Sequence, residues 1–355
     1  MSEAAMTRAV LAGGPAALTL TDAAATGSVI HLLDDSRLAI DTVMSNITSA
    51  LYGDGDEIDT DLVVKGSGTP MLYQPATTAR ALFPFSTVGS STLSIVPQIG
   101  KSIFGSTFGA LTSSSAADAT ALWASPNGDT FLIANYGITK PPDLNLGTNK
   151  PIFGPIEIAG IISTASGAGG FFDPSVTNAY YTTATGVAFT PAALDTTSLG
   201  RGSYTATWAG KTITSSQTQD GFQITHEYKV ESRQALGGRT CDMILVSWRV
   251  MCKFIPVGAN ATMTNIQTDL ASGGVVGSIQ GARRGKLAAA LTLTGPTTAS
   301  GADKLVTVVL NNCVLKSAGF VFGNKPLRNG ELGFVSTWGT AGPAGTTYPT
   351  LMTLT

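Results

Sequence analysis

The chain has 355 residues, of which only 12% are Asp, Glu, Lys or Arg, whereas Thr (48) and Gly (41) are abundant. An ordinary soluble domain carries about a quarter charged residues, and a free enzyme of this size uses surface charge to stay dispersed. Charged residues are depleted at the centres of protein interfaces because their desolvation is costly. The composition therefore favours an assembly subunit over a freely diffusing enzyme.

The net charge of −2 conceals an asymmetry along the chain. Residues 1–62 hold ten acidic and two basic residues, which gives −8, so the remainder carries +6. Opposite signs on two parts of one subunit suit head-to-tail self-association, and a solvated acidic loop is an equally good explanation of the acidic part. The sequence has no broad basic stripe of the kind that indicates tight nucleic-acid binding.

Residues 9–20 have the apolar character of a signal peptide, but Gly13, Gly14 and Pro15 interrupt the run. We therefore expect no cleaved signal peptide, and no run reaches the roughly 18 apolar residues of a membrane span. The three cysteines lie in apolar, strand-like surroundings without metal-site spacing; they are Cys241, Cys252 and Cys313. This pattern predicts buried free thiols, which fit assembly in a reducing cytoplasm.

Strand-like runs bounded by Gly, Pro, Asn or Asp recur along the whole chain. They cover Ser28–Leu33, Asp61–Lys65, Ser91–Val96, Thr130–Ala134, Tyr204–Trp208, Phe222–Glu231, Asp242–Phe254, Lys304–Leu310 and Gly319–Phe322. In Phe222–Glu231 apolar or aromatic residues alternate with polar ones, as a half-buried strand requires. Ala235–Arg239 supplies turn residues before Asp242–Phe254, so these two segments are predicted to form a long hairpin.

Helices are predicted at few positions. Asn260–Ala271 places Met263, Ile266 and Leu270 on one face and ends before two glycines. A shorter turn is expected at Ala76–Leu82, and residues 163–202 are interpreted as a long loop or peripheral insertion.

Strands without intervening helices predict an all-β fold with minor α content, a barrel or sandwich with one flanking helix and long loops. We expect residues 1–355 to form a single domain, with residues 1–60 as an acidic N-terminal arm that contains strands.

Few residues of the sequence are candidates for catalysis. His31 and His226 lie in strand-like alternation, which favours packed or interface imidazoles over proton shuttles. Ile95–Ser102 ends like a phosphate-binding loop, but Ile95 stands where the first glycine should be, so Lys101 is predicted to be a surface or interface lysine. A GxSxG motif does not occur. We expect no catalytic residue, no cofactor and no enzymatic activity.

Two charged clusters remain to be explained. The acidic run Asp54–Asp61 fails the register of a calcium-binding EF-hand, because Ile58 and Lys65 fall on ligand positions. It is interpreted as a solvated or lumen-facing turn, with adventitious cation binding as the alternative, and no metal site is predicted. The basic cluster Arg283, Arg284 and Lys286 has too few charges to indicate nucleic-acid binding. Together with Asp54 and Asp56, it is predicted to lie at a subunit interface.

Several segments in order resemble the tail tube (major tail) proteins of long-tailed bacteriophages, over roughly residues 75–335. These segments are Arg80–Phe85, Gly100–Gly105, Asn127–Asp129, Phe131–Thr139, Pro142 with Leu144 and Leu146–Gly147, Ile152–Gly154, Tyr204–Trp208, Asp220–Ile224 and Phe254–Pro256. The resemblance implies a β-barrel or sandwich flanked by a helix, which would be Asn260–Ala271. It also implies identical subunits in rings, commonly hexameric, whose inner sheets line a DNA channel.

The implied partners are further copies of the chain, other tail proteins and DNA in transient, non-specific passage, without a membrane. The implied location is the virion tail, after assembly in the host cytoplasm. Another β-rich virion protein, such as a capsid, decoration or baseplate protein, is the alternative. A carbohydrate-binding or hydrolytic β domain is the third possibility; its paired carboxylates beside exposed aromatics are not evident, because the acids cluster away from the tryptophans.

Overall fold

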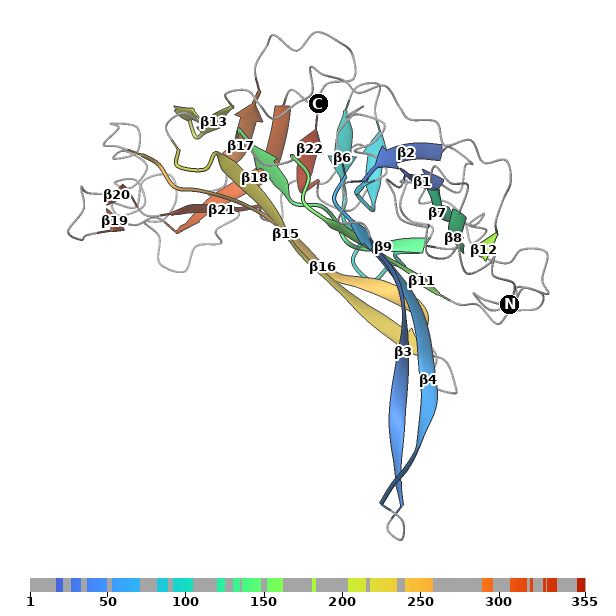
Figure 1. Ribbon diagram of the computed structural model, residues 1–355. Helices are drawn as coiled ribbons and strands as arrows, with labels where there is room; N and C mark the ends of the chain where they lie inside the picture. The colour runs from blue at the N-terminus through green and yellow to red at the C-terminus, as the bar shows by residue number, and fades with distance from the viewer. Residues whose placement is uncertain are drawn as a thin grey trace.

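Strands make up almost all the regular structure of the computed structural model (Figure 1). All pairings between its strands are antiparallel in the described part of the chain. The all-β prediction is therefore confirmed. The structure describes residues 17–21, 27–32, 37–49, 53–70, 82–88, 92–104, 120–124, 130–134, 136–147, 152–161, 181–182, 204–214, 218–234, 240–257, 289–295, 307–317, 320–321, 328–329, 331–336 and 350–354.

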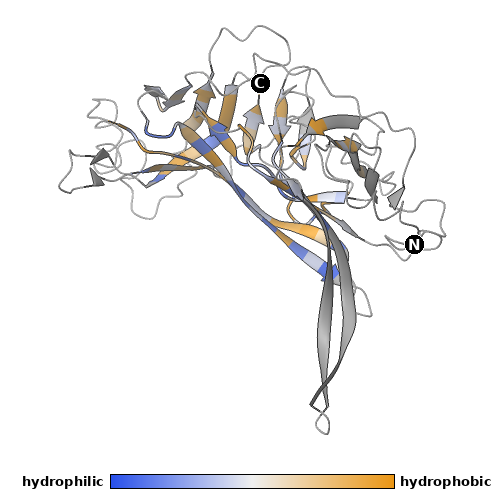
Figure 2. Cartoon of the chain, viewed as in Figure 1, coloured by the Kyte–Doolittle hydropathy of each residue, from blue (hydrophilic) through white to orange (hydrophobic). Residues whose placement is uncertain are grey.

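The largest sheet has eleven strands, eight of them in the order β10-β15-β16-β21-β18-β17-β13-β14, with β22, β6 and β5 continuing from β18. Polar and apolar residues mix along its strands, as Figure 2 shows in blue and orange, because one face of the sheet is buried. Its strands are β5 (Ser86–Val88), β6 (Leu93–Ile95), β10 (Leu144–Leu146), β13 (Thr205–Trp208), β14 (Lys211–Thr214), β15 (Phe222–Gln234), β16 (Thr240–Phe254), β17 (Ala289–Thr294), β18 (Thr307–Ser317), β21 (Leu332–Ser336) and β22 (Met352–Leu354).

The predicted long hairpin is confirmed as β15 and β16. Gln223 pairs with Lys253 at one end and Gln234 with Thr240 at the other, with register shifts after Lys229 and Arg233. Burial follows the predicted alternation at the start of β15, where Phe222 and Ile224 are fully buried. The period of two therefore located this hairpin because one of its faces lies against the core.

A four-stranded sheet has the order β3-β4-β11-β9, formed by β3 (Arg37–Ser49), β4 (Gly53–Gly68), β9 (Tyr136–Lys140) and β11 (Ile156–Ile161). A five-stranded sheet has the order β12-β8-β7-β1-β2, formed by β1 (Ala17–Thr21), β2 (Gly27–His31), β7 (Thr120–Ala124), β8 (Thr130–Ala134) and β12 (Tyr181–Thr182). A two-stranded pair joins β19 (Phe320–Val321) to β20 (Arg328–Asn329).

One apolar core joins the three larger sheets. Its members include Leu20 of the five-stranded sheet, Ile158 of the four-stranded sheet and Trp208 of the large sheet. The Trp208 ring lies edge-on to Phe334 at 5.2 Å, and its Nε1–H donates to the carbonyl oxygen of Cys313 at 3.1 Å. This bond satisfies the indole donor of a tryptophan that is only 2% exposed.

Several expectations fall outside the described residues. The flanking helix at Asn260–Ala271 and the basic cluster Arg283, Arg284 and Lys286 lie in the undescribed stretch 258–288. Of residues 163–202, only Tyr181–Thr182 is described, as the short strand β12. Of the expected turn at Ala76–Leu82, only Leu82 is described.

Candidate assembly site

The most distinctive backbone feature is the hairpin of β3 and β4, which extends away from the sheets (Figure 1). Strand β11 pairs with β4 only over Val63–Gly68, so Gly53–Leu62 pairs with β3 alone among the described strands. These ten residues would span roughly 34 Å at about 3.4 Å per residue. We call this part, Thr42–Ser49 with Gly53–Leu62, the ribbon.

The ribbon corrects one prediction. The acidic run Asp54–Asp61 is part of strand β4 and not a turn. Asp54 is in register with Thr48 and Asp56 with Ile47, with a register shift between these two positions. The Asp and Gly residues of the run are poor strand formers, and pairing with a 13-residue partner strand overrides that preference. The structure thus places Asp54 and Asp56 on the ribbon, while their predicted partners Arg283, Arg284 and Lys286 lie outside the described residues.

His226 is a packed imidazole, as its strand alternation predicted. Its ring lies 5.5 Å from Phe83 and 5.8 Å from Trp248, and the Trp248 Nε1–H donates to its Nδ1 at 3.0 Å. Because Nδ1 accepts this bond, the proton of the neutral ring is on Nε2, which is buried without a hydrogen-bond partner.

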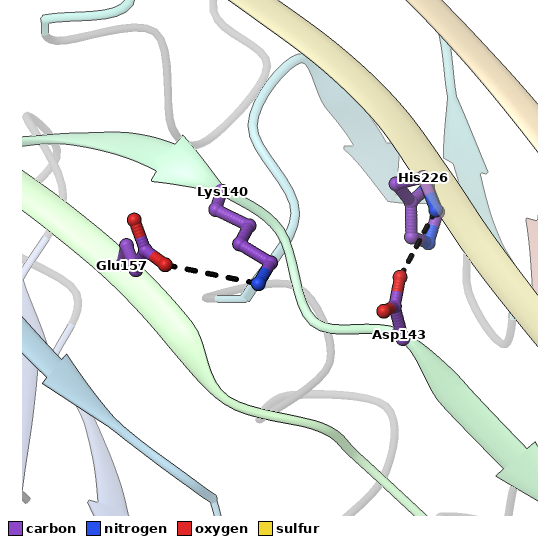
Figure 3. A network of polar contacts seen from close by, with 4 residues as sticks. All are labelled: Lys140, Asp143, Glu157 and His226. Carbon is purple, nitrogen blue, oxygen red and sulfur yellow. Dashed lines mark hydrogen bonds and ion pairs between the residues drawn. The ribbon is translucent and has the colours of Figure 1, made fainter.

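Burial lowers the pKa of His226 to about 3, so the imidazole is neutral at pH 7. Asp143 accepts a hydrogen bond from the backbone N–H of His226 at 3.0 Å, and Lys140 lies 3.7 Å from Glu157 on the neighbouring strand (Figure 3). The Asp143 contact fixes the backbone of His226, and the Lys140–Glu157 pair joins β9 to β11. With Nδ1 accepting from Trp248 and Nε2 enclosed, the ring offers no free nitrogen for proton transfer to a substrate. The side chain of His31 is not among those described.

The segment that ends like a phosphate-binding loop is paired with β16. The N–H of Gly100 donates to Leu245 O at 2.8 Å, and Lys101 O accepts from the N–H of Leu245 at 3.0 Å. The hydroxyl of Ser102 donates to Asp242 at 2.5 Å. The backbone N–H of Gly100 and the hydroxyl of Ser102, which a phosphate-binding loop would direct at its ligand, are therefore already bonded to β16. Lys101 is an exposed surface lysine, as predicted.

Two of the three cysteines are buried and free, as predicted: Cys252 and Cys313. Burial raises the pKa of both thiols, and the neighbouring Cys252 raises that of Cys313 further. Cys241 lies in strand β16, and its side chain is not among those described.

Among the described residues, no group of three His, Cys, Asp or Glu side chains is placed to hold a metal ion. No helix in the described part of the chain is long and apolar enough to cross a membrane.

Sequence reasoning missed β3 and the first half of β4. The signal was present in the β-branched residues of Arg37–Ser49, which favour strands.

No family model matches the sequence, and no curated protein matches it.

Proposed function

We propose that this chain is a structural virion protein, a subunit of a phage tail tube that self-assembles into stacked rings around a channel for DNA. The observation that carries the proposal is the ribbon. A two-stranded hairpin alone is marginally stable in water, so a ribbon of this length requires a neighbouring surface. A contact between two different patches of identical subunits closes rings around an axis and extends stacks along it.

The composition supports the same proposal. A chain with only 12% charged residues is poorly suited to life as a free monomer and well suited to burial against further copies. In the proposed assembly the large sheet and the four-stranded sheet act as a β-barrel or sandwich, with Asn260–Ala271 as its flanking helix. The rings are hexameric, the further partners are other tail proteins and passing DNA, and the protein acts without enzymatic activity in the virion after assembly in the host cytoplasm.

Electron microscopy of the purified protein in negative stain tests this function. Stacked rings or tubes are expected. Closed shells or isolated trimers would instead indicate a capsid, decoration or baseplate protein. A protein that stays monomeric and binds glycans or hydrolyses them would overturn the structural role altogether.

The predicted interface residues are tested by charge reversal. Close charge pairs at a desolvated interface couple by roughly 1.5–7 kcal/mol, whereas exposed pairs usually give less than about 1 kcal/mol. Arg283→Glu with Arg284→Glu should therefore block polymerisation and leave a folded monomer. Adding Asp54→Lys and Asp56→Lys should restore assembly if these groups meet.

Normal assembly of the arginine variant would show that the basic cluster is solvated. Failure to assemble without rescue by the acidic reversals would show that the arginines bind a different partner. Circular dichroism of each variant confirms that the fold is intact.

A further inference from the structure

Six adjacent strands of the large sheet carry two rows of side chains on the face opposite the core, nine of them with a hydroxyl group and one, Val309, apolar. One row runs Thr212, Thr207, Thr292, Val309, Thr353, Ser94, and each residue is in register with the next. A second row runs Thr214, Thr205, Thr294, Thr307. We call these ten residues the hydroxyl face. It crosses β14, β13, β17, β18, β22 and β6, which follow one another in the sheet order (Figure 1).

The orientation of the hydroxyl face follows from burial. Ala206, Leu293 and Val308 alternate with its threonines and are at most 3% exposed. The ten residues themselves are partly or fully exposed. Strands with their apolar residues on one side present the hydroxyl face on the other side.

The hydroxyl face contains no charged residue, although the same sheet carries charges elsewhere. On β15 and β16 the exposed positions include Glu227, Lys229 and Arg249, and Glu227 is in register with Arg249. The six strands of the hydroxyl face carry two described lysines, neither of them in its rows. Lys211 is in register with the buried Trp208, and Lys316 lies beyond the part of β18 that pairs with β17. The rows themselves rely on threonine, whose β-branched side chain suits a strand and whose hydroxyl keeps the surface wet.

The hydroxyl face is poorly suited to tight binding of any partner. Protein interfaces depend on Trp, Tyr and Arg anchors, and threonine is under-represented among the residues that carry binding energy. Tight DNA binding requires Lys or Arg at the phosphates. Two of the hydroxyls also bond to each other: Thr207 Oγ1 and Thr212 Oγ1 are 3.2 Å apart on neighbouring strands. Such a surface stays hydrated and neither holds nor strongly repels a polyanion.

We propose that the hydroxyl face is the wall past which double-stranded DNA moves, the lumen-facing surface of the assembled tube. This inference rests on the proposed function and identifies which surface of the chain meets the DNA. A wall without cationic side chains suits a moving polyanion, because each phosphate held by Lys or Arg would slow its passage.

Thiol labelling of assembled tubes tests the placement. Thr292→Cys lies near the middle of the longer row and Ser94→Cys at its end, so the two variants report on the same face independently. Each is treated with a small maleimide and with a maleimide attached to a globular protein too large to enter the tube. Dissociated subunits should react with both reagents, and the wild-type chain gives the background of its own cysteines.

In tubes, the small maleimide should label both variants and the large reagent neither. Labelling by the large reagent would place the face on the outside of the tube and overturn the inference. Protection from both reagents would place it between subunits and overturn it as well. Failure of the wild-type chain to form tubes would instead refute the proposed function, so the two failures are distinguishable.

A second measurement tests the role of neutrality. Tubes of Thr205→Lys with Thr292→Lys should retain short duplex DNA at low salt, and each lysine that meets a phosphate steepens the slope of log K against log salt by about 0.9. Tubes with glutamine at both positions are the matched control and should retain as little DNA as the wild type. Equal retention by the lysine and glutamine tubes would overturn the inference.

Discussion

Acid should destabilise this fold through His226 more than through any exposed histidine. The ring is enclosed by Phe83 and Trp248, and its Nδ1 already accepts the Trp248 Nε1–H. A proton on Nδ1 would place two donors face to face, and the carboxylate of Asp143 accepts from the backbone N–H of the same residue. Tyr228, whose ring contacts Trp248, has its pKa raised by burial and stays neutral over the acidic range. Protonation therefore costs the folded state a buried, poorly compensated charge.

The direction and size of this pH effect on stability follow from the linkage between protonation of His226 and unfolding. The pKa of His226 is about 3 in the folded protein and near its ordinary 6.5 in the unfolded chain, so only the unfolded chain gains the proton between these values. The contribution to stability is complete above pH 6.5 and falls by about 1.4 kcal/mol per pH unit down to pH 3. Between pH 7.5 and pH 5 the loss from this one group should be about 2 kcal/mol.

Urea unfolding of the dissociated subunit at pH 7.5 and pH 5, followed by tryptophan fluorescence, measures this loss. His226→Gln cannot titrate, so its free energy of unfolding should fall by about 2 kcal/mol less than that of the wild type over the same interval. His31→Gln is the control for histidine removal: it keeps His226 and should therefore keep the loss of about 2 kcal/mol assigned to that residue. Equal losses in the wild type and His226→Gln would refute the reasoning. If His226→Gln does not fold, the wild-type imidazole resonances followed by NMR decide the question, because one must titrate below pH 4.

Three further predictions concern the sheets. Met251→Pro should abolish folded protein in a solubility and circular dichroism assay, because Met251 pairs with strands on both sides. Val246→Pro should destabilise the fold less, because Val246 lies at a register shift. Gly137→Ala should lower the free energy of unfolding by about 1–3 kcal/mol in urea titration, since its Cβ would lie 2.7 Å from Ile103 Cγ1, and Ile103→Val should recover part of the loss. Trp208→Phe should cost about 1–3 kcal/mol and Trp208→Ala about 3–5 kcal/mol by the same titration, the former chiefly by removing the buried hydrogen bond to the Cys313 carbonyl oxygen.

The extent to which sequence predicts this fold depends on burial. The hairpin of β15 and β16 was predictable because Phe222 and Ile224 face the core and alternate with partly exposed residues. The strand Thr130–Ala134 was also predicted with the bounds that β8 has in the structure. Where one face of a strand is buried, every second side chain must be apolar, so the hydrophobic period of the sequence predicts the strand.

The sheet order was not predictable in the same way. Strand β22, near the C-terminus, pairs with β18 on one side and with β6 on the other. Nothing in Met352–Leu354 or Leu93–Ile95 identifies the other segment as its neighbour, because short apolar strands are interchangeable in local pattern. Their pairing depends on the whole chain closing around one core.

The strands of the ribbon could not be predicted from the hydrophobic period of the sequence. Apolar and polar residues do not alternate in Asp54–Asp61, which has the composition of a turn. Its extended form comes from its hydrogen-bonded pairing with β3, which the local sequence of neither segment predicts. The same reasoning applies to the hydroxyl face, where Thr205–Thr207, Thr212–Thr214 and Thr292–Thr294 each repeat threonine at every second position. Each repeat alone is an ordinary strand pattern, and only the register that aligns all three produces a continuous uncharged surface.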